Sequence, residues 1–327
     1  MRILILSFLF INLYITAFSQ VINGTIFDKK TFDIIGYATV YFNGTFVGTS
    51  SDQNGNFELN ISKENRSMPI TVSCIGYHSA TLTDFSETEP LIIYLQAQLY
   101  ELSDASIIGK SLERKRRRYL RLLKEELIGT TANARGCKIL NENDISFNYY
   151  SDEDTVKAYA LKPILIENKA LGYKITYYLD RFEYYKKSQA TFYSGNFIFN
   201  DDLTEDVEQA QIYKKRREHT YLGSRMHLFR VFWSGQLKSS GFTIRNPSNK
   251  SLKLETIVFQ DGLQNKYLSY SSSLLIDYND RKSIIEFVKQ PVYFDESGFF
   301  DLGIKWTGDI ALQRIADRLP YEYTIEQ

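Results

Sequence analysis

The residues that could bind a metal ion are few and far apart in this chain. Its three histidines are His78, His219 and His227, and none has a glutamate three residues further on. A zinc peptidase needs closely spaced histidine and carboxylate ligands that leave one metal position open. His219 and His227 could still meet in space, but the spacing predicts no metal site and no zinc-dependent activity.

Serine and nucleotide chemistry also lack their usual motifs. Gly-x-Ser-x-Gly is absent, and its nearest fragment is Gly223-Ser224. Because a largely apolar segment comes next, we expect Ser224 to cap a helix over residues 225–234 rather than to act as a nucleophile. The chain contains neither GxxxxGK[ST] nor GxGxxG. We therefore predict a protein without an enzymatic activity and without a cofactor.

Clustered carboxylates keep one catalytic alternative open, since glycosidases need only two carboxyl groups at a suitable separation. The clusters are Asp152-Glu153-Asp154, Asp201-Asp202 with Glu205-Asp206, and Asp277 with Asp280. All of them fall in or beside predicted loops, where acidic residues are typical of solvated turns. We favour the turn interpretation and keep a hydrolase acting on envelope or dietary polymers as an alternative.

Aromatic residues are abundant, with 24 tyrosines and 22 phenylalanines. Two predicted strands are rich in them, Ile175-Thr176-Tyr177-Tyr178 and Phe182-Glu183-Tyr184-Tyr185. Such rings could stack on sugars, which makes a glycan-binding module another alternative. Packing in a core and across strands explains the same rings more simply.

A polar turn organises the front of the chain. Asn54-Gly55 is a strong hairpin signal, because a type I′ turn needs positive φ at both central residues, so we expect two strands to meet there. Asp52 and Asn54 imitate calcium ligands, but Phe57 and Lys63 stand where a calcium loop needs glycine and glutamate. We interpret Asp52, Asn54 and Gly55 as a structural turn.

Residues 20–99 have the rhythm of a small antiparallel β-sandwich. Short strands between turns are expected at 21–26, 38–42, 57–61, 70–75, 78–82 and 91–95. The residues that set the spacing are Gly24, Asp28, Gly36, Ala38, Val40, Gly48, Thr49, Asp52, Gly55, Phe57, Ser73, Gly76, Tyr77, Ile93 and Leu95. Their order resembles the carboxypeptidase-like regulatory domain family. The resemblance implies a transthyretin-like, Ig-like sandwich, found at the front of exported Bacteroidetes proteins that include TonB-dependent receptors.

The chain after the sandwich departs from the receptor pattern, because too little of it remains for a plug and a long barrel. Residues 100–128 are instead expected to be a linker with a basic helix over 110–127, whose leucines share one side. The basic residues are Arg114, Lys115, Arg116, Arg117, Arg118, Arg121 and Lys124. They form either a surface for anionic lipid or a partner protein, or a solvated connector whose charges are screened. Of these two interpretations of the basic helix, we favour the solvated connector.

Residues 129–327 are expected to form a larger, β-rich α+β domain. Strand patterns occupy 145–199 and 252–294, and helical patterns lie between them at 205–218 and 225–234. Segments 127–131, 137–141, 166–175, 221–224 and 314–320 resemble the C-terminal region of exported Bacteroidetes proteins that are named only by their front domain. This resemblance implies no activity.

The first 19 residues are typical of a secretory signal. Arg2 supplies a positive charge, an apolar stretch comes next, and Ala17-Phe18-Ser19 is a small-x-small cleavage site before Gln20. An uncleaved anchor is the weaker interpretation, because a spanning helix needs about 20 apolar residues. Cys74 and Cys137 are the only cysteines. A disulfide between them stays open as an alternative, although it would bridge two predicted domains.

The net charge of the chain narrows the kinds of partner that it can attract. The chain has 39 basic and 39 acidic residues, so no global field draws it to nucleic acid. We therefore expect an exported, non-catalytic cell-envelope protein, periplasmic or associated with the outer membrane. Its expected partner is an envelope protein complex or an anionic membrane surface, with a glycan as the alternative and no nucleic acid.

Overall fold

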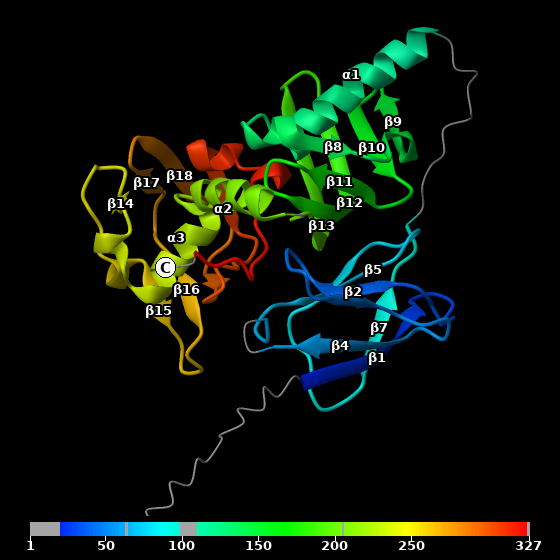
Figure 1. Cartoon of the computed structure of the whole chain (residues 1–327), viewed down its shortest axis with the longest axis horizontal. Helices are drawn as coiled ribbons and strands as arrows, with labels where there is room; N and C mark the ends of the chain where they lie inside the picture. Colours follow the sequence, from blue (N-terminus) through cyan, green and yellow to red (C-terminus); the bar gives the residue numbers. More distant parts are fainter. Residues whose placement is uncertain (1–19, 63–64, 99–109, 205, 326–327) are drawn as a thin grey trace, which may run out of the picture.

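The computed structural model describes residues 20–62, 65–98, 110–204 and 206–325. Strands dominate this part of the chain and form three groups, each around its own hydrophobic core (Figure 1). The predicted fold class, mainly β with an α+β second part, is confirmed. The predicted signal segment 1–19, and residues 99–109 of the predicted linker, lie outside the described residues.

The front group is a sandwich of two sheets. Its strands are β1 (Gln20–Asp28), β2 (Thr39–Phe42), β3 (Gly48–Ser50), β4 (Asn56–Ile61), β5 (Ile70–Ser73), β6 (Ala80–Leu82) and β7 (Leu91–Leu95). One sheet has the order β4-β1-β7 and the other β3-β2-β5-β6. In β4 every second side chain enters the core, as the alternating sequence predicted. The predicted antiparallel arrangement is wrong for one pair: β1 and β7 are parallel, because the chain crosses through the other sheet between them.

The turn at Asn54-Gly55 does not join a hairpin. The strands on either side, β3 and β4, belong to different sheets, and only Gly55 has a positive φ, of 73°. The Asp52 carboxylate accepts hydrogen bonds from the backbone N–H groups of Asn54 and Asn56, at 2.8 and 2.9 Å. These bonds replace the cross-strand ladder of a hairpin, so the turn carries the chain from one sheet to the other.

The central group is one sheet covered by a helix. Its strands are β8 (Cys137–Ile139), β9 (Ile145–Tyr150), β10 (Thr155–Ala160), β11 (Ile164–Asn168), β12 (Tyr173–Tyr185) and β13 (Ala190–Asp202). The order is β8-β11-β12-β10-β9, and β13 pairs with β12. Helix α1 (Lys110–Leu127) buries Leu120, Leu123 and Leu127 in the core of this group. The predicted solvated connector is therefore wrong for this helix, because its leucine side has a sheet to pack against.

The third group completes the chain. Its strands are β14 (Phe242–Arg245), β15 (Val258–Gln260), β16 (Lys266–Leu268), β17 (Leu274–Tyr278), β18 (Arg281–Phe287), β19 (Val292–Phe294) and β20 (Ile304–Gly308), with helices α2 (Val207–Tyr221) and α3 (Arg225–Ser234). They form two sheets, β14-β17-β18-β20 and β15-β16-β19. Ser224 caps α3 as predicted, since its hydroxyl accepts from the His227 N–H. The region predicted as one domain, 129–327, thus holds two cores.

A loop of the front sandwich binds the edge strand of the central sheet. The Gly44 N–H donates to the carbonyl of Phe197 in β13 at 2.8 Å, and the Asn43 side-chain oxygen accepts from the Phe197 N–H at 2.8 Å. One step along β13, the Phe199 N–H donates to the Thr45 carbonyl at 2.9 Å. The loop therefore pairs with β13 almost as a further strand would.

The C-terminal segment holds the same loop from its other side. The Tyr321 N–H donates to the Gly44 carbonyl at 3.0 Å, and the Glu322 carboxylate accepts from the Phe46 N–H at 2.8 Å. In Figure 1 this segment, coloured red, runs between the groups. It therefore connects the front sandwich to the rest of the chain independently of residues 99–109.

The packing of α1 yields a stability prediction. Replacing the fully buried Leu123 by alanine should lower the free energy of unfolding by about 3 kcal/mol, because it removes apolar contacts and leaves a cavity. Leu302→Ala is the matched control, since that side chain is 95% exposed and its loss should change stability by less than about 0.5 kcal/mol. Urea unfolding measures both. Small and equal effects would mean that α1 is a linker after all.

Candidate functional site

Cations cover the outer face of α1. Arg114, Lys115, Arg117, Arg118 and Arg121 are exposed, and none of their side chains has a hydrogen bond or ion pair with any other residue of the described part. The four arginines follow the spacing i, i+3, i+4 and i+7, so they form one stripe. The helix runs along the outside of the central sheet (Figure 1). The stripe is therefore open to a partner.

This stripe is unfavourable for the helix itself. Arg114 and Arg118 are four residues apart, as are Arg117 and Arg121, and like charges at that spacing destabilise a helix by roughly 0.2–0.5 kcal/mol for each pair. Glu113 and Glu125 stand four residues from Arg117 and Arg121, but neither forms an ion pair with them among the described residues, so they offset the repulsion only in part. A row of like charges without ion pairs indicates a role outside the fold.

The other two predicted cations serve the fold. The guanidinium of Arg116 donates to the backbone carbonyl of Glu142 at 2.6 Å, and Lys124 forms an ion pair with the Glu142 carboxylate. Beside them, the ring of Tyr119 packs against Phe147 of β9 with centroids 6.0 Å apart. The predicted surface is thus divided, with Arg116 and Lys124 facing the sheet and five cations facing solvent.

The carboxylate clusters have structural explanations. Ion pairs join Asp154 to Lys186, Asp201 to Lys174, Asp202 to Arg217 and Asp277 to Arg245. Asp206 caps α2 by accepting from the Gln209 N–H at 2.7 Å. Asp152, Glu153 and Asp280 are exposed, and Glu205 lies outside the described residues. The geometry therefore supports the turn interpretation over catalysis.

Two cavities in the described part are too small for a polymer substrate. One, of about 10 Å³, lies beside β17 and β18 and is lined by Gly223, Arg281 and Gln313. The other, of about 30 Å³, lies where the front sandwich meets the central sheet and is lined by Tyr178 and Asp180. Volumes of this size hold one or two water molecules, whereas ligand sites have several hundred Å³.

The two aromatic segments of the second part pack inside the protein. Tyr177 and Phe182 are buried in the central core. The ring of Tyr178 stacks on Tyr41 of the front sandwich with centroids 5.6 Å apart, and its hydroxyl donates to the Thr39 hydroxyl at 2.8 Å. These rings therefore form the core and the domain junction, and they are not available for stacking on a sugar.

Two exposed rings of the central sheet are each covered by a cation. The Lys186 ammonium lies 3.3 Å from the ring centroid of Tyr149, and the Arg181 guanidinium lies 4.7 Å from that of Phe192. A cation held over a ring competes for the face on which a sugar would stack. The central sheet thus gives little support to glycan binding.

The histidines do not come together. His219 is exposed on α2, whereas His227 packs against Tyr221 and Phe242, and its Nδ1 accepts from the Gly223 N–H at 3.0 Å. No cluster of three or more potential metal ligands occurs in residues 20–62, 65–98, 110–204 and 206–325. His227 is a core residue whose acceptor nitrogen is already used.

The two cysteines are free, so the disulfide left open by the sequence does not form. Burial, together with the nearby Asp317, raises the pKa of the Cys137 thiol to about 12. Burial also raises the pKa of Cys74. The thiolate is the nucleophilic form, so neither side chain is suited to catalysis at neutral pH.

The front sandwich exposes aromatic residues that the sequence patterns did not reveal. Phe32 and Tyr37 have φ of 61°, and their side chains are 67% and 75% exposed. The ring of Phe32 lies edge-on to the exposed Tyr94. A left-handed backbone is strained for a bulky residue, and a largely solvated ring offsets little of that strain through packing. Sequence patterns do not report φ, so this signal was not visible.

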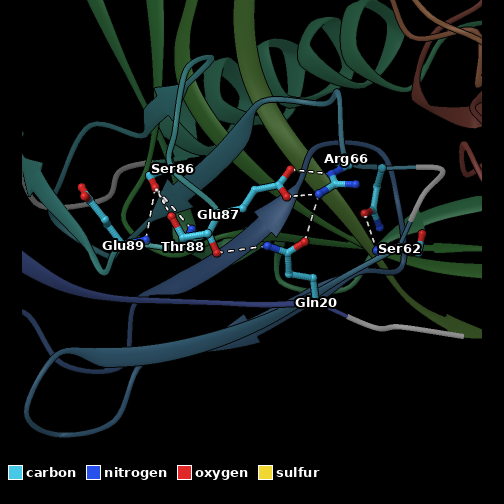
Figure 2. A network of polar contacts seen from close by, with 8 residues as sticks. Gln20, Ser62, Arg66, Ser86, Glu87, Thr88 and Glu89 are labelled. Atoms are coloured by element: carbon cyan, nitrogen blue, oxygen red, sulfur yellow. Dashed lines mark hydrogen bonds and ion pairs between the residues drawn. The ribbon is translucent and has the colours of Figure 1, made fainter. Parts of the chain in front are cut away.

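A polar network closes the start of β1 (Figure 2). The Arg66 guanidinium forms an ion pair with the Glu87 carboxylate and donates to the Gln20 side-chain oxygen at 3.0 Å, while the Gln20 amide donates to the Glu87 carbonyl at 3.1 Å. The Arg66 hydrogen bond lowers the pKa of Glu87. Because the network is solvated, it contributes little stability, and it fixes the loop positions around Gln20.

Comparison with known proteins defines the class of the front sandwich. Residues 22–104 match the family model described as CarboxypepD_reg-like domain. The front domain is therefore a carboxypeptidase-like regulatory domain, as its glycine and aromatic spacing predicted. No curated protein matches the chain. Among the described residues, no helix has the length and apolar character needed to cross a membrane.

His227 yields a pH prediction. Burial, with Arg230 and Arg281 nearby, lowers its pKa from 6.5 to about 4. As the pH falls, His227 is therefore protonated at a higher pH in the unfolded chain than in the folded protein. The free energy of unfolding should decrease between about pH 6.5 and 4, by at most roughly 3 kcal/mol from this residue.

Urea unfolding at several pH values tests this assignment. His227→Gln should flatten the decrease, and His219→Gln is the matched control because that side chain is exposed. A decrease that disappears in the His219 variant and persists in the His227 variant would contradict the assignment.

Proposed function

We propose that the protein is an exported, non-catalytic cell-envelope protein that binds an acidic partner through the outer face of α1. The observation that carries this proposal is the stripe of exposed arginines whose side chains have no partners in the described part of the chain. The apolar segment before Gln20 supports export. The balanced net charge means that attraction must come from this local face.

The packing of α1 favours an acidic protein over a lipid surface. A helix that lies in a membrane interface inserts an apolar face between the lipids. In this protein Leu120, Leu123 and Leu127 are already buried against the central sheet, so α1 has no apolar face left to insert. Its solvent side is a row of guanidinium groups, each of which can bind a carboxylate on a partner protein through paired hydrogen bonds.

Neutralising the stripe should release the partner. The variant Arg114→Gln, Arg117→Gln, Arg118→Gln and Arg121→Gln removes four charge pairs, each worth roughly 0.5 kcal/mol when solvated, so affinity should fall about 30-fold. The matched control neutralises four exposed lysines elsewhere, Lys29, Lys30, Lys187 and Lys253. Cross-linking in intact cells followed by mass spectrometry identifies the partner, and titration with the purified partner measures the affinity.

The outcomes separate the alternatives. Enrichment of one envelope protein that the control keeps and the arginine variant loses supports the proposal. Equal recovery with both variants would refute the assignment to α1. Binding to anionic vesicles but to no protein would replace the protein partner by a lipid surface.

A second candidate is glycan binding, and the exposed rings of the front sandwich favour it. Phe32, Tyr37 and Tyr94 present solvated aromatic faces on that domain, and two of them occupy strained backbone positions. Aromatic rings on a rigid scaffold are suited to stacking on the apolar faces of sugars. The candidate sugar-binding surface thus lies on the front sandwich and not on the aromatic strands of the second domain.

Tyr37 tests that candidate. Because asparagine tolerates a left-handed backbone, Tyr37→Asn should raise the free energy of unfolding by about 1 kcal/mol. It should also abolish any shift of the melting temperature that soluble polysaccharides cause in the natural protein. Leu302→Asn, at another exposed position, should change neither quantity. If no polysaccharide in a broad panel shifts the melting temperature, glycan binding is ruled out.

A further inference from the structure

Three arginines from distant parts of the chain meet at the start of α3. Arg225 is the first residue of that helix, and Arg314 and Arg318 flank the short 3-10 turn Ile315–Asp317. The backbone N–H of Arg225 donates to the Gln313 side chain at 3.4 Å, which places the two segments side by side. We call Arg225, Arg314 and Arg318 the arginine cluster.

The hydrogen bonds of the arginine cluster are incomplete. Arg225 donates through Nη2 to the Ile310 carbonyl at 3.1 Å, but its Nε is buried without a hydrogen-bond partner in the described structure. By contrast, Arg230 of the same helix donates to three backbone carbonyls, those of Ser297, Tyr323 and Tyr321. A buried guanidinium N–H without a partner is rare, because it loses its hydrogen bonds to water and gains none within the protein.

The charge balance around Arg225 is unfavourable. Arg318 and Arg314 act on it as like charges, beside the tyrosines Tyr193 and Tyr321, while its guanidinium lies 5.1 Å from the ring centroid of Trp306. Burial and the two arginines lower the pKa of Arg225 to about 9. Its place at the positive end of the α3 dipole adds a further unfavourable interaction.

Two carboxylates lie near the other two arginines and offset part of their charge, Asp317 beside Arg318 and Glu126 beside Arg314. Asp317 accepts hydrogen bonds from the Thr131 hydroxyl and from the Asn133 amide. Glu126 approaches Arg314 only to 3.7 Å, and the Arg314 guanidinium donates instead to the Tyr193 hydroxyl at 2.9 Å. The Arg318 side chain has no hydrogen bond or ion pair with another described residue. The cluster thus combines three half-buried cations with two nearby carboxylates, which leaves one positive charge in excess.

We propose that the arginine cluster is a binding site for a phosphate group. A tetrahedral phosphate oxyanion accepts from several guanidinium groups at once, and it would supply the acceptors that the Arg225 Nε and the Arg318 side chain lack. The Tyr193 hydroxyl is a further donor within the same site. All three arginines are half-buried, so the cluster lies between the interior and the surface.

This site is separate from the outer face of α1. The ligand is either free phosphate or the phosphate of an ester such as glycerol phosphate, since both present the same oxyanion. Titrations with each compound distinguish them, because an ester that binds more tightly than inorganic phosphate makes contacts beyond the oxyanion.

Calorimetric titration of the purified full chain with inorganic phosphate tests the site, with chloride at equal ionic strength as the reference. Saturable binding is expected, and Arg318→Gln should weaken it at least tenfold. Arg135→Gln removes an exposed arginine outside the site and should leave the affinity unchanged. Because the Arg318 side chain makes no hydrogen bond within the described structure, its variant should fold and should be at least as thermostable as the natural protein in phosphate-free buffer.

The outcomes are decisive in both directions. A phosphate response equal to that of chloride, or one that Arg318→Gln leaves intact, would overturn the proposal. A lower stability of Arg318→Gln than of the natural protein in phosphate-free buffer would show that the charge of Arg318 is already compensated. That result would also count against the proposal. None of these results depends on the partner of α1, so the two proposals fail independently.

Discussion

The arrangement of this protein depends on one short loop of the front sandwich, residues 43–46, which is hydrogen-bonded on both sides. Strand β13 pairs with it on one side and the C-terminal segment on the other, mostly through backbone groups. Gly44 has a φ of 80°, and a Cβ there would lie 2.9 Å from the Tyr321 ring, so no other residue fits without displacing the tail. These contacts attach the regulatory domain to the rest of the molecule. They therefore also set the position of its exposed rings relative to the α1 stripe.

Much of the front domain could be predicted from the sequence because its determinants are local. The alternation along β4 and the capping of α3 by Ser224 depend on residues within one element. The hairpin at Asn54-Gly55 failed because a turn signal reports backbone conformation and not which sheet receives the next strand. Helix α1 was misjudged as a connector because its leucine side gives no sign of the distant strands that cover it.

The candidate sites show the same limit. The basic residues of α1 were recognised as a group, but their division into inward and outward sets requires the position of Glu142. The arginine cluster could not be found at all, since about 90 residues separate Arg225 from Arg314 and Arg318. The chain has 39 basic and 39 acidic residues, so its net charge indicates neither the α1 stripe nor the arginine cluster. Which cations lack an acidic partner is decided by the contacts in the fold and not by composition.

The fold departs from locally favourable choices at a few described positions, and these positions bear on function. The departures are the like charges along α1, the left-handed Phe32 and Tyr37, and the buried, incompletely bonded Arg225. Such departures concentrate at functional positions, and they persist because the surrounding structure holds them in place. Meanwhile the carboxylates, histidines and thiols of the described residues are paired, packed or solvated in ordinary ways. The departures thus lie at cations and aromatic rings, the groups that form the proposed binding surfaces.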